Sequence, residues 1–242
     1  MEVNWNSSFV HEVQELILAW TMSTDSKPMV AYAKHLGTPV ILVSINYRVN
    51  IFGFAYFKAT NKLPRTICNL GLHDQKLALR WVKRNIAEFG GDPQKITIFG
   101  ESAGAISVHA HMQCPYSPIL GEDEALFWRV IMQSGSLYTS PPAPPAAIQG
   151  LTRRVCAEVG IGYDDIDDAV ERLRVVPPDQ LLEVLLKLSV TVMWVTDDSE
   201  VSGGGVLFAR GKRDWRDCNY GDWFNGVMLG DVEHEVSNSS IR

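Results

Sequence analysis

Long apolar segments and a leader-like N-terminus are absent from this sequence. The longest apolar runs, such as Val40–Val43, fall far short of the roughly 20 residues that a membrane span needs. The chain begins with Met1 and an acidic Glu2, without a basic and then apolar stretch, so it has no recognisable secretory signal. As it stands, the chain is therefore expected in the cytoplasm.

Cysteine is scarce, and its spacing excludes the usual zinc sites. No pair has the CxxC spacing, and none clusters with histidine. We expect reduced, partly buried thiols, with a single disulfide as the alternative, and neither a metal ion nor a cofactor. The four cysteines are Cys68, Cys114, Cys156 and Cys218.

Basic residues are in the minority, with 22 Lys and Arg against 28 Asp and Glu and a net charge of −6. They are scattered along the chain, so no stripe of positive charge could neutralise a row of phosphates, and a nucleic-acid partner is not expected. Hydrophobic residues make up 46% and charged residues 21%, which is the balance of a globular protein. At 242 residues the chain can form one α/β domain or two small ones.

Short β-branched runs alternate with helical patterns along the chain. Helices are predicted over 74–89, 102–112 and much of 147–188. Strands are predicted near 39–45, 95–99, 130–132 and 226–229. This alternation predicts an α/β fold with a mainly parallel sheet flanked by helices.

Glycine and proline mark the ends of these elements. Gly90 is expected to end the 74–89 helix in the left-handed conformation, and Gly160 to end a helix that begins at 151. The proline-rich segment 138–145 is interpreted as a surface loop in preference to an interdomain linker. The apolar stripe expected on the 74–89 helix comprises Ala78, Trp81, Val82, Ile86 and Phe89.

One segment carries a catalytic pattern, because Gly100-Glu101-Ser102-Ala103-Gly104 fits G-x-S-x-G. The pattern alone is weak, but it lies directly between a predicted strand and a predicted helix, as a nucleophile elbow requires. A Cβ on either glycine would collide with the adjoining strand or helix. The turn also points the Ser102 hydroxyl outward and places the Ala103 N–H where an oxyanion would develop. An idle serine in a glycine-rich turn is the alternative.

The chain resembles the type-B carboxylesterase/lipase family, which includes the cholinesterases, with its closest likeness to the fungal branch. The likeness is dense from about residue 25 to 140, looser through the helical stretch, and returns at 227–235. The segments that carry it are Asn46–Phe54, Asn69–Gln75, Leu79–Val82, Ile86–Pro93, Ile96–Gly104 and Met132–Ser136.

This resemblance implies an α/β-hydrolase fold and a small, neutral carboxylic ester as substrate. By resemblance Ser102 is the nucleophile, Ala103 the oxyanion donor and Glu235 the acidic member of the triad, while Glu233 is the competing assignment. We expect one partial α/β-hydrolase domain over 1–242. Its sheet core and elbow would occupy about 1–140, a mostly helical insertion 141–225, and the strand carrying the acid 226–242.

A base for Ser102 is the missing component. In this fold the histidine follows the acid along the chain, and none of the seven residues after Glu235 is histidine. His234 is the remaining alternative, although a continuing strand would turn it away from the side of Glu235. Structural or surface roles are expected for all the histidines, which are His11, His35, His73, His109, His111 and His234.

The family's upstream His-Gly-Gly segment, which supplies further oxyanion donors after a strand, has no counterpart here. The first glycine is Gly37, although 14–20 could supply the strand. We therefore expect an ester hydrolase truncated at both ends and almost inactive, because losing the histidine costs on the order of 10⁶ in rate. A non-catalytic binding or adhesion module on the same fold is the alternative, and the intact Ser102 favours the enzyme.

Overall fold

The fold is built around a five-stranded parallel sheet. The computed structural model describes residues 15–19, 27–63, 65–113, 125–189, 195 and 225–231. The strands lie in the order β2-β1-β3-β4-β5, and each neighbouring pair is parallel. Their bounds are β1 Glu15–Ala19, β2 Val40–Ser44, β3 Ile96–Glu101, β4 Arg129–Gln133 and β5 Gly226–Gly230. The parallel α/β architecture expected from the alternating pattern is confirmed.

The central strand is β3, which carries the expected elbow at its end. It pairs with β1 on one side and with β4 on the other, and its residues from Ile96 to Gly100 are buried. A strand covered on both faces is mostly apolar, and Ile96, Ile98 and Phe99 meet this requirement, with the buried Thr97 between them. The segment 14–20, proposed only as a possible strand, provides β1.

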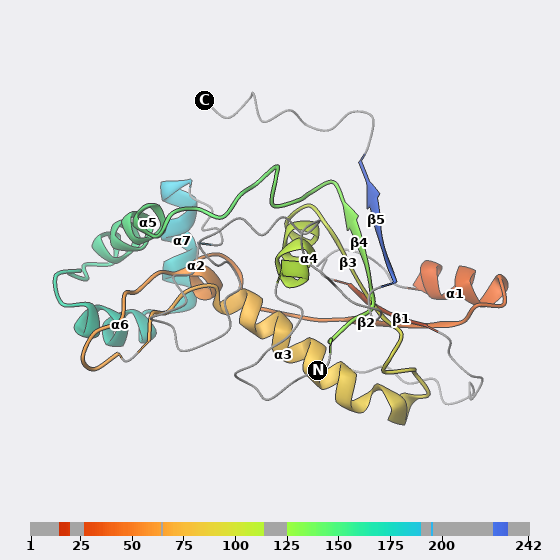
Figure 1. Ribbon diagram of the computed structural model, residues 1–242. Helices are drawn as coiled ribbons and strands as arrows, with labels where there is room; N and C mark the ends of the chain where they lie inside the picture. Colours follow the sequence, from red (N-terminus) through yellow and green to blue (C-terminus); the bar gives the residue numbers. More distant parts are fainter. Residues whose placement is uncertain are drawn as a thin grey trace.

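The helices connect the strands, and only some of them pack against the sheet (Figure 1). Their bounds are α1 Lys27–His35, α2 Asn50–Phe54, α3 Leu70–Asn85, α4 Ala103–Gln113, α5 Pro145–Glu158, α6 Ile166–Arg174 and α7 Pro178–Leu188, with a 3₁₀ turn η1 at Ile86–Phe89. No helix in these described stretches is both long and apolar enough to cross a bilayer. As expected, Gly90 and Gly160 are left-handed and follow η1 and α5.

Helix α3 differs from its prediction in two respects. It begins at Leu70, four residues before Asp74, and its buried stripe runs through Leu72, Gln75, Leu79 and Val82. The expected placement of Trp81 in that stripe is wrong, because Trp81 is 42% exposed. Its ring lies 6.1 Å from the ring of Phe89 at the surface.

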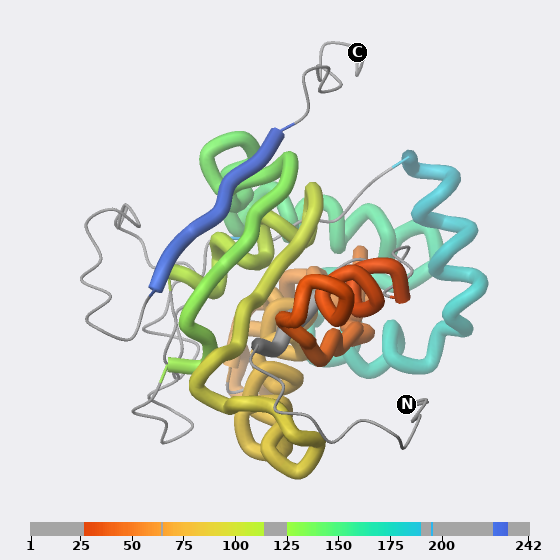
Figure 2. The backbone as a smooth tube through the Cα atoms, turned by 90° about the vertical axis from the view of Figure 1, so that its right-hand side faces the viewer, coloured from red at the N-terminus to blue at the C-terminus, as the bar shows by residue number. Residues whose placement is uncertain are grey.

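Helix α4 lies between two hydrophobic cores, and every residue from Gly104 to Met112 is buried. Ala105 and Val108 join the core formed with the sheet and α3. Ile106 and Ala110 join the core formed with α2 and α5 to α7. Figure 1 shows α4 between the sheet and the group α5 to α7, and Figure 2 shows the strands from the side on which α1 lies. A helix held on both sides gives the elbow a rigid support.

Candidate active site

The elbow serine has the strained backbone that the sequence pattern predicts. Ser102 lies between the end of β3 and the start of α4, and its φ is 52°, in the left-handed region. Two backbone hydrogen bonds hold this turn. The Ser102 N–H donates to the Gln133 carbonyl at 2.8 Å, and the Ile106 N–H donates to the Ser102 carbonyl at 3.1 Å. The exposed side chain of Ser102 therefore stands at the carboxyl edge of the sheet.

Close backbone approach explains the first glycine of the motif. A Cβ on Gly100 would lie 2.3 Å from the carbonyl carbon of Gly104 and 2.5 Å from its oxygen. Such distances cannot be accommodated without moving β3 or α4. The collision expected at Gly100 is thus confirmed, and Gly104 is its buried partner.

The Ala103 amide lies at the start of α4, directly after Ser102. Ala103 opens α4, so its N–H is among the four amide groups that have no acceptor within the helix. The positive end of the helix dipole adds to the attraction for a developing negative charge. Glu101, Ser102 and Ala103 are all exposed at this edge of the sheet.

Two histidines that follow Ser102 in the sequence are structural. His109 accepts a hydrogen bond from the Leu137 N–H at its Nδ1 atom, at 3.1 Å. His111 Nε2 lies 2.9 Å from Gln75 Oε1. Both imidazoles are about 1% exposed, so neither can exchange protons with a substrate at the elbow. Their expected structural role is confirmed.

The other two described histidines have different surroundings. His35 ends α1 just before β2, so it lies at the amino edge of the parallel sheet, opposite Ser102. His73 is half-buried in α3, and burial, followed by the charge of Lys76, lowers its pKa. His11 and His234 lie outside the described residues. Within the described part of the chain, the Ser102 side chain forms no hydrogen bond with an imidazole.

The acid assignment stays a prediction, because Glu233 and Glu235 also lie outside the described residues. The strand before them, β5, is placed. Its end is tied to the elbow edge, since the Ser134 N–H donates to the Gly230 carbonyl at 2.8 Å. Because β3, β4 and β5 are parallel neighbours, the carboxyl end of β5 lies at the same sheet edge as Ser102.

The segment that follows β4 also shapes the elbow, although sequence reasoning assigned it no role. Ser134 is left-handed, with φ 53°. A Cβ on Gly135 would lie 2.4 Å from the Ser102 carbonyl oxygen. Both residues belong to the Met132–Ser136 segment that carried part of the family likeness, and that likeness was the only signal for them.

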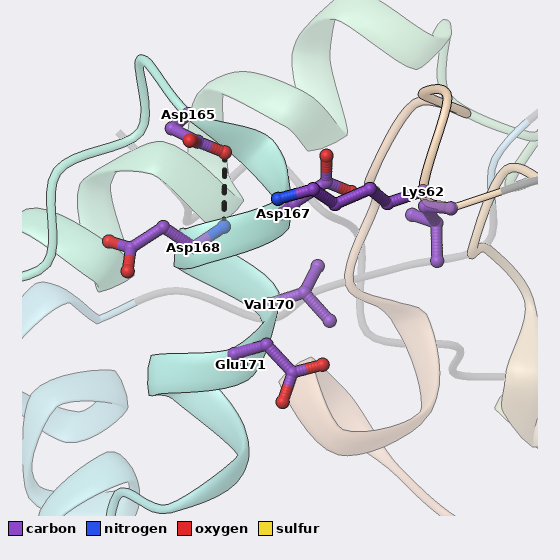
Figure 3. Close-up of a pocket in the computed structure, with 7 residues that line it drawn as sticks. Lys62, Asp165, Asp167, Asp168, Val170 and Glu171 are labelled. Carbon is purple, nitrogen blue, oxygen red and sulfur yellow. Dashed lines mark hydrogen bonds between the residues drawn. The ribbon is translucent and has the colours of Figure 1, made fainter.

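A pocket lies away from the elbow, between the segment around Lys62 and helix α6. Figure 3 shows its acidic lining, in which Asp165 accepts a hydrogen bond from the Asp168 N–H at 3.1 Å and so caps α6. Asp167 accepts another from the Thr60 hydroxyl at 2.6 Å. The carboxylates of Asp165 and Asp167 therefore have structural roles. Over the part of the chain that is described, no group of three His, Cys, Asp or Glu is arranged to hold a metal ion.

The likeness to known proteins covers most of the chain. Residues 17–206 match the carboxylesterase family. A cholinesterase of Mus musculus is 43% identical over 145 residues, which is 59% of this chain and 22% of that protein. Lipase 2 of Diutina rugosa is 39% identical, over 64% of this chain and 28% of the lipase. An inactive carboxylesterase-like protein of Byssochlamys spectabilis is 38% identical, over 64% of this chain and 26% of that protein.

Solved structures show the same relationship. Juvenile hormone esterase of Manduca sexta superposes with a TM-score of 0.66 at 25% identity, over 84% of this chain and 38% of the esterase. Carboxylesterase EST55 of Geobacillus stearothermophilus gives 0.60 at 38% identity, over 77% of this chain and 39% of that enzyme. The fold is that of the α/β hydrolases. The chain spans about a quarter of the length of the curated relatives it matches.

Proposed function

Because the chain belongs to the carboxylesterase family, we propose that it carries the nucleophile half of a site that hydrolyses small, neutral carboxylic esters. Ser102 is the nucleophile, Ala103 the oxyanion donor and Glu235 the acid, with Glu233 as the alternative acid. The observation that supports this most is the left-handed Ser102 between the end of a central parallel strand and a buried helix.

The chemistry follows from this geometry. The Ser102 oxygen attacks the ester carbonyl carbon while its proton passes to a base, and the carbonyl oxygen becomes an oxyanion that accepts the Ala103 N–H. This intermediate then collapses and expels the alcohol, which takes a proton from the base. An acyl group stays on Ser102. Water, deprotonated by the same base, then attacks the acyl carbon. The bond from this carbon to the Ser102 oxygen breaks, the oxygen takes the proton back from the base, and the carboxylic acid is released.

The described residues do not supply the base that accepts the Ser102 proton. At neutral pH the Ser102 hydroxyl is almost fully protonated, and it is a weak nucleophile without an imidazole. Losing the histidine of a serine hydrolase costs on the order of 10⁶ in rate. We therefore propose that chain 1–242 by itself is almost inactive while keeping a correctly shaped nucleophile turn.

Hydrolysis of p-nitrophenyl acetate by the purified chain tests this proposal. We expect turnover only slightly above background and well below about one per second, with little change in Ser102→Ala. Added imidazole should then supply the absent base. Because imidazole itself hydrolyses the ester, the readout is the acyl group on the Ser102 peptide, measured by mass spectrometry.

Acylation that imidazole accelerates in the wild type, and that Ser102→Ala lacks, would support the nucleophile assignment. Acylation elsewhere, or none at all, would contradict it. Turnover above about one per second that disappears in Ser102→Ala would show that the chain contains its own base. His234→Ala would be the next variant.

A non-catalytic binding module is the second candidate. It is favoured by the absence of a hydrogen bond from Ser102 to any imidazole in the described part of the chain. One relative of similar identity is itself named an inactive carboxylesterase-like protein. Imidazole rescue separates the two candidates, because a surface that only binds has no reason to acylate Ser102.

A further inference from the structure

We propose that Gln75 is a positioning residue for the nucleophile turn and holds the first turn of α4 through a buried chain of hydrogen bonds. This inference rests on the proposed function, since it concerns the same serine. Gln75 lies in α3, 27 positions before Ser102 in the sequence, and its side chain is completely buried. An amide buried without partners would be costly, so the atoms around it are informative.

The hydrogen bonds have one consistent direction. His111 Nε2 lies 2.9 Å from Gln75 Oε1, and a carbonyl oxygen can only accept, so the imidazole donates. Gln75 Nε2 can only donate, and it lies 3.3 Å from the Ser107 hydroxyl oxygen. Ser107 then uses its own proton to donate to the Ala103 carbonyl at 2.9 Å. The chain thus runs from His111 through Gln75 and Ser107 to Ala103.

The residue next to Gln75 extends this support to the loop after β2. Next to Gln75, Asp74 accepts two hydrogen bonds from the Arg48 side chain, at 2.6 and 2.7 Å, and one from its backbone N–H at 3.1 Å. One turn of α3 therefore joins this loop to the elbow helix.

The chain of hydrogen bonds ends at Ala103, and this residue links it to the reaction. Ala103 carries the proposed oxyanion N–H on one side and the carbonyl held by Ser107 on the other. Fixing this carbonyl fixes the orientation of the first turn, and with it the direction of the Ser102 hydroxyl. Small displacements of a reacting group are expensive, since a shift of about 1 Å can cost on the order of 10²-fold in rate.

Two substitutions break the chain of hydrogen bonds at different places, and a third serves as a matched control. Ser107→Ala removes the hydroxyl that holds Ala103, and Gln75→Leu removes the amide that holds Ser107. Thr152→Val is the control. Thr152 is equally buried, donates to the carbonyl four residues earlier at 2.9 Å and accepts the Tyr56 N–H at 3.1 Å, but it lies in α5.

The first readout is hydrogen exchange of individual amides by NMR. In Ser107→Ala and Gln75→Leu, the amides of Ser102 and Ile106 should exchange at least about tenfold faster. The Ile98 amide in the middle of β3 should not change. Thr152→Val should leave both elbow amides unchanged. Equal acceleration at all three positions, or none at Ser102, would overturn the proposal, because the effect would then be global or absent.

The second readout is the imidazole-dependent acylation of Ser102. Both variants should lower the acylation rate about tenfold or more without changing its half-saturating ester concentration. The double variant should be no slower than Gln75→Leu alone, because the two residues act in one chain. Additive losses would overturn the coupling. If the wild type is not acylated, the proposed function fails, and the exchange rates alone decide whether Gln75 positions the turn.

Discussion

At the scale of single residues, the strained conformation of Ser102 is maintained by its neighbours. A left-handed backbone costs a residue with a side chain about 1–3 kcal/mol. The bonds from the Ser102 N–H to Gln133 and from the Ile106 N–H to Ser102 hold that conformation. Gly100 and Gly135 leave room for the closely approaching backbone. The strain therefore belongs to the site, and small changes around it should be costly.

Gly100→Ala should destabilise the protein by at least about 1–3 kcal/mol, the usual cost of forcing a methyl group into a packed interior. The reason is that the new Cβ would lie 2.3 Å from the Gly104 carbonyl carbon. Urea unfolding measures the change. Gly150→Ala is the control, because that position lies in α5, where the new Cβ would meet no atom within 4 Å beyond its own stretch of helix backbone. It should raise stability by about 0.5–1 kcal/mol. Equal effects of the two substitutions would refute the clash.

Buried His111 should make the fold sensitive to acid. Burial, together with Lys76 and His73, lowers its pKa from 6.5 to about 3. Between these values the unfolded chain binds a proton that the folded chain does not. Above pH 6.5 the buried, neutral His111 does not lower the free energy of unfolding. As the pH falls below this value, the free energy of unfolding decreases, by about 1.4 kcal/mol for each pH unit once the unfolded imidazole is protonated.

Urea unfolding over this pH range measures that slope. His111→Gln keeps an N–H donor for Gln75 but cannot titrate there, so its stability should fall less steeply with acid than that of the wild type. His73 also has a lowered pKa, but it is present in both proteins and cancels in the comparison. Parallel slopes for the two proteins would show that His111 is not the responsible group.

At the scale of elements, hydrophobic periodicity predicted individual helices and strands, which depend on neighbouring residues in the sequence. Strand 95–99 and helix 102–112 were recovered as β3 and α4 because apolar residues continue through both and a glycine-rich turn separates them. Helix α1 was missed because it buries no residue, so no apolar stripe marks it. The five-residue α2 is too short to show a period.

The contacts that hold the site could not be read from the sequence, because they join distant positions. Gln75 and His111 are 36 residues apart, and nothing in the pattern of either helix shows that their side chains meet. In the sequence, the Asn69–Gln75 segment stands out only by its likeness to the carboxylesterase family. Glu235 remains a prediction of the same kind.

Asn69 should connect the start of α3 to the distant residue Val195 in the same non-local way. Its side chain is fully buried, donates to the Val195 carbonyl at 2.8 Å and accepts the Val195 N–H at 2.9 Å. Asn69→Ala would leave both Val195 groups without these partners, so we expect a loss of about 2–4 kcal/mol in urea unfolding. Asn69 also has a φ of 50°, so Asn69→Gly should lose less than Asn69→Ala. A loss below about 1 kcal/mol in both would contradict the role of this pair.

At the scale of the whole molecule, β5 is an edge strand of the sheet among the described residues. Among the described residues β5 pairs only with β4, so its outer N–H and C=O groups can accept another strand. Met228 and Leu229 are 62% and 60% exposed, whereas Val227 packs against the core. An apolar strand with a free edge is a template for association between chains.

We therefore expect the purified chain to associate or to be poorly soluble, as measured by size-exclusion chromatography with light scattering. Met228→Lys and Leu229→Lys should each raise the monomer fraction, because a lysine on an edge strand opposes pairing. Val175→Lys is the control, since Val175 is 80% exposed but lies beside α6, away from the sheet. If it dissolved aggregates equally well, general surface hydrophobicity would be the cause. A wild-type chain that is a monodisperse monomer with cooperative unfolding would show that the β5 edge does not drive association.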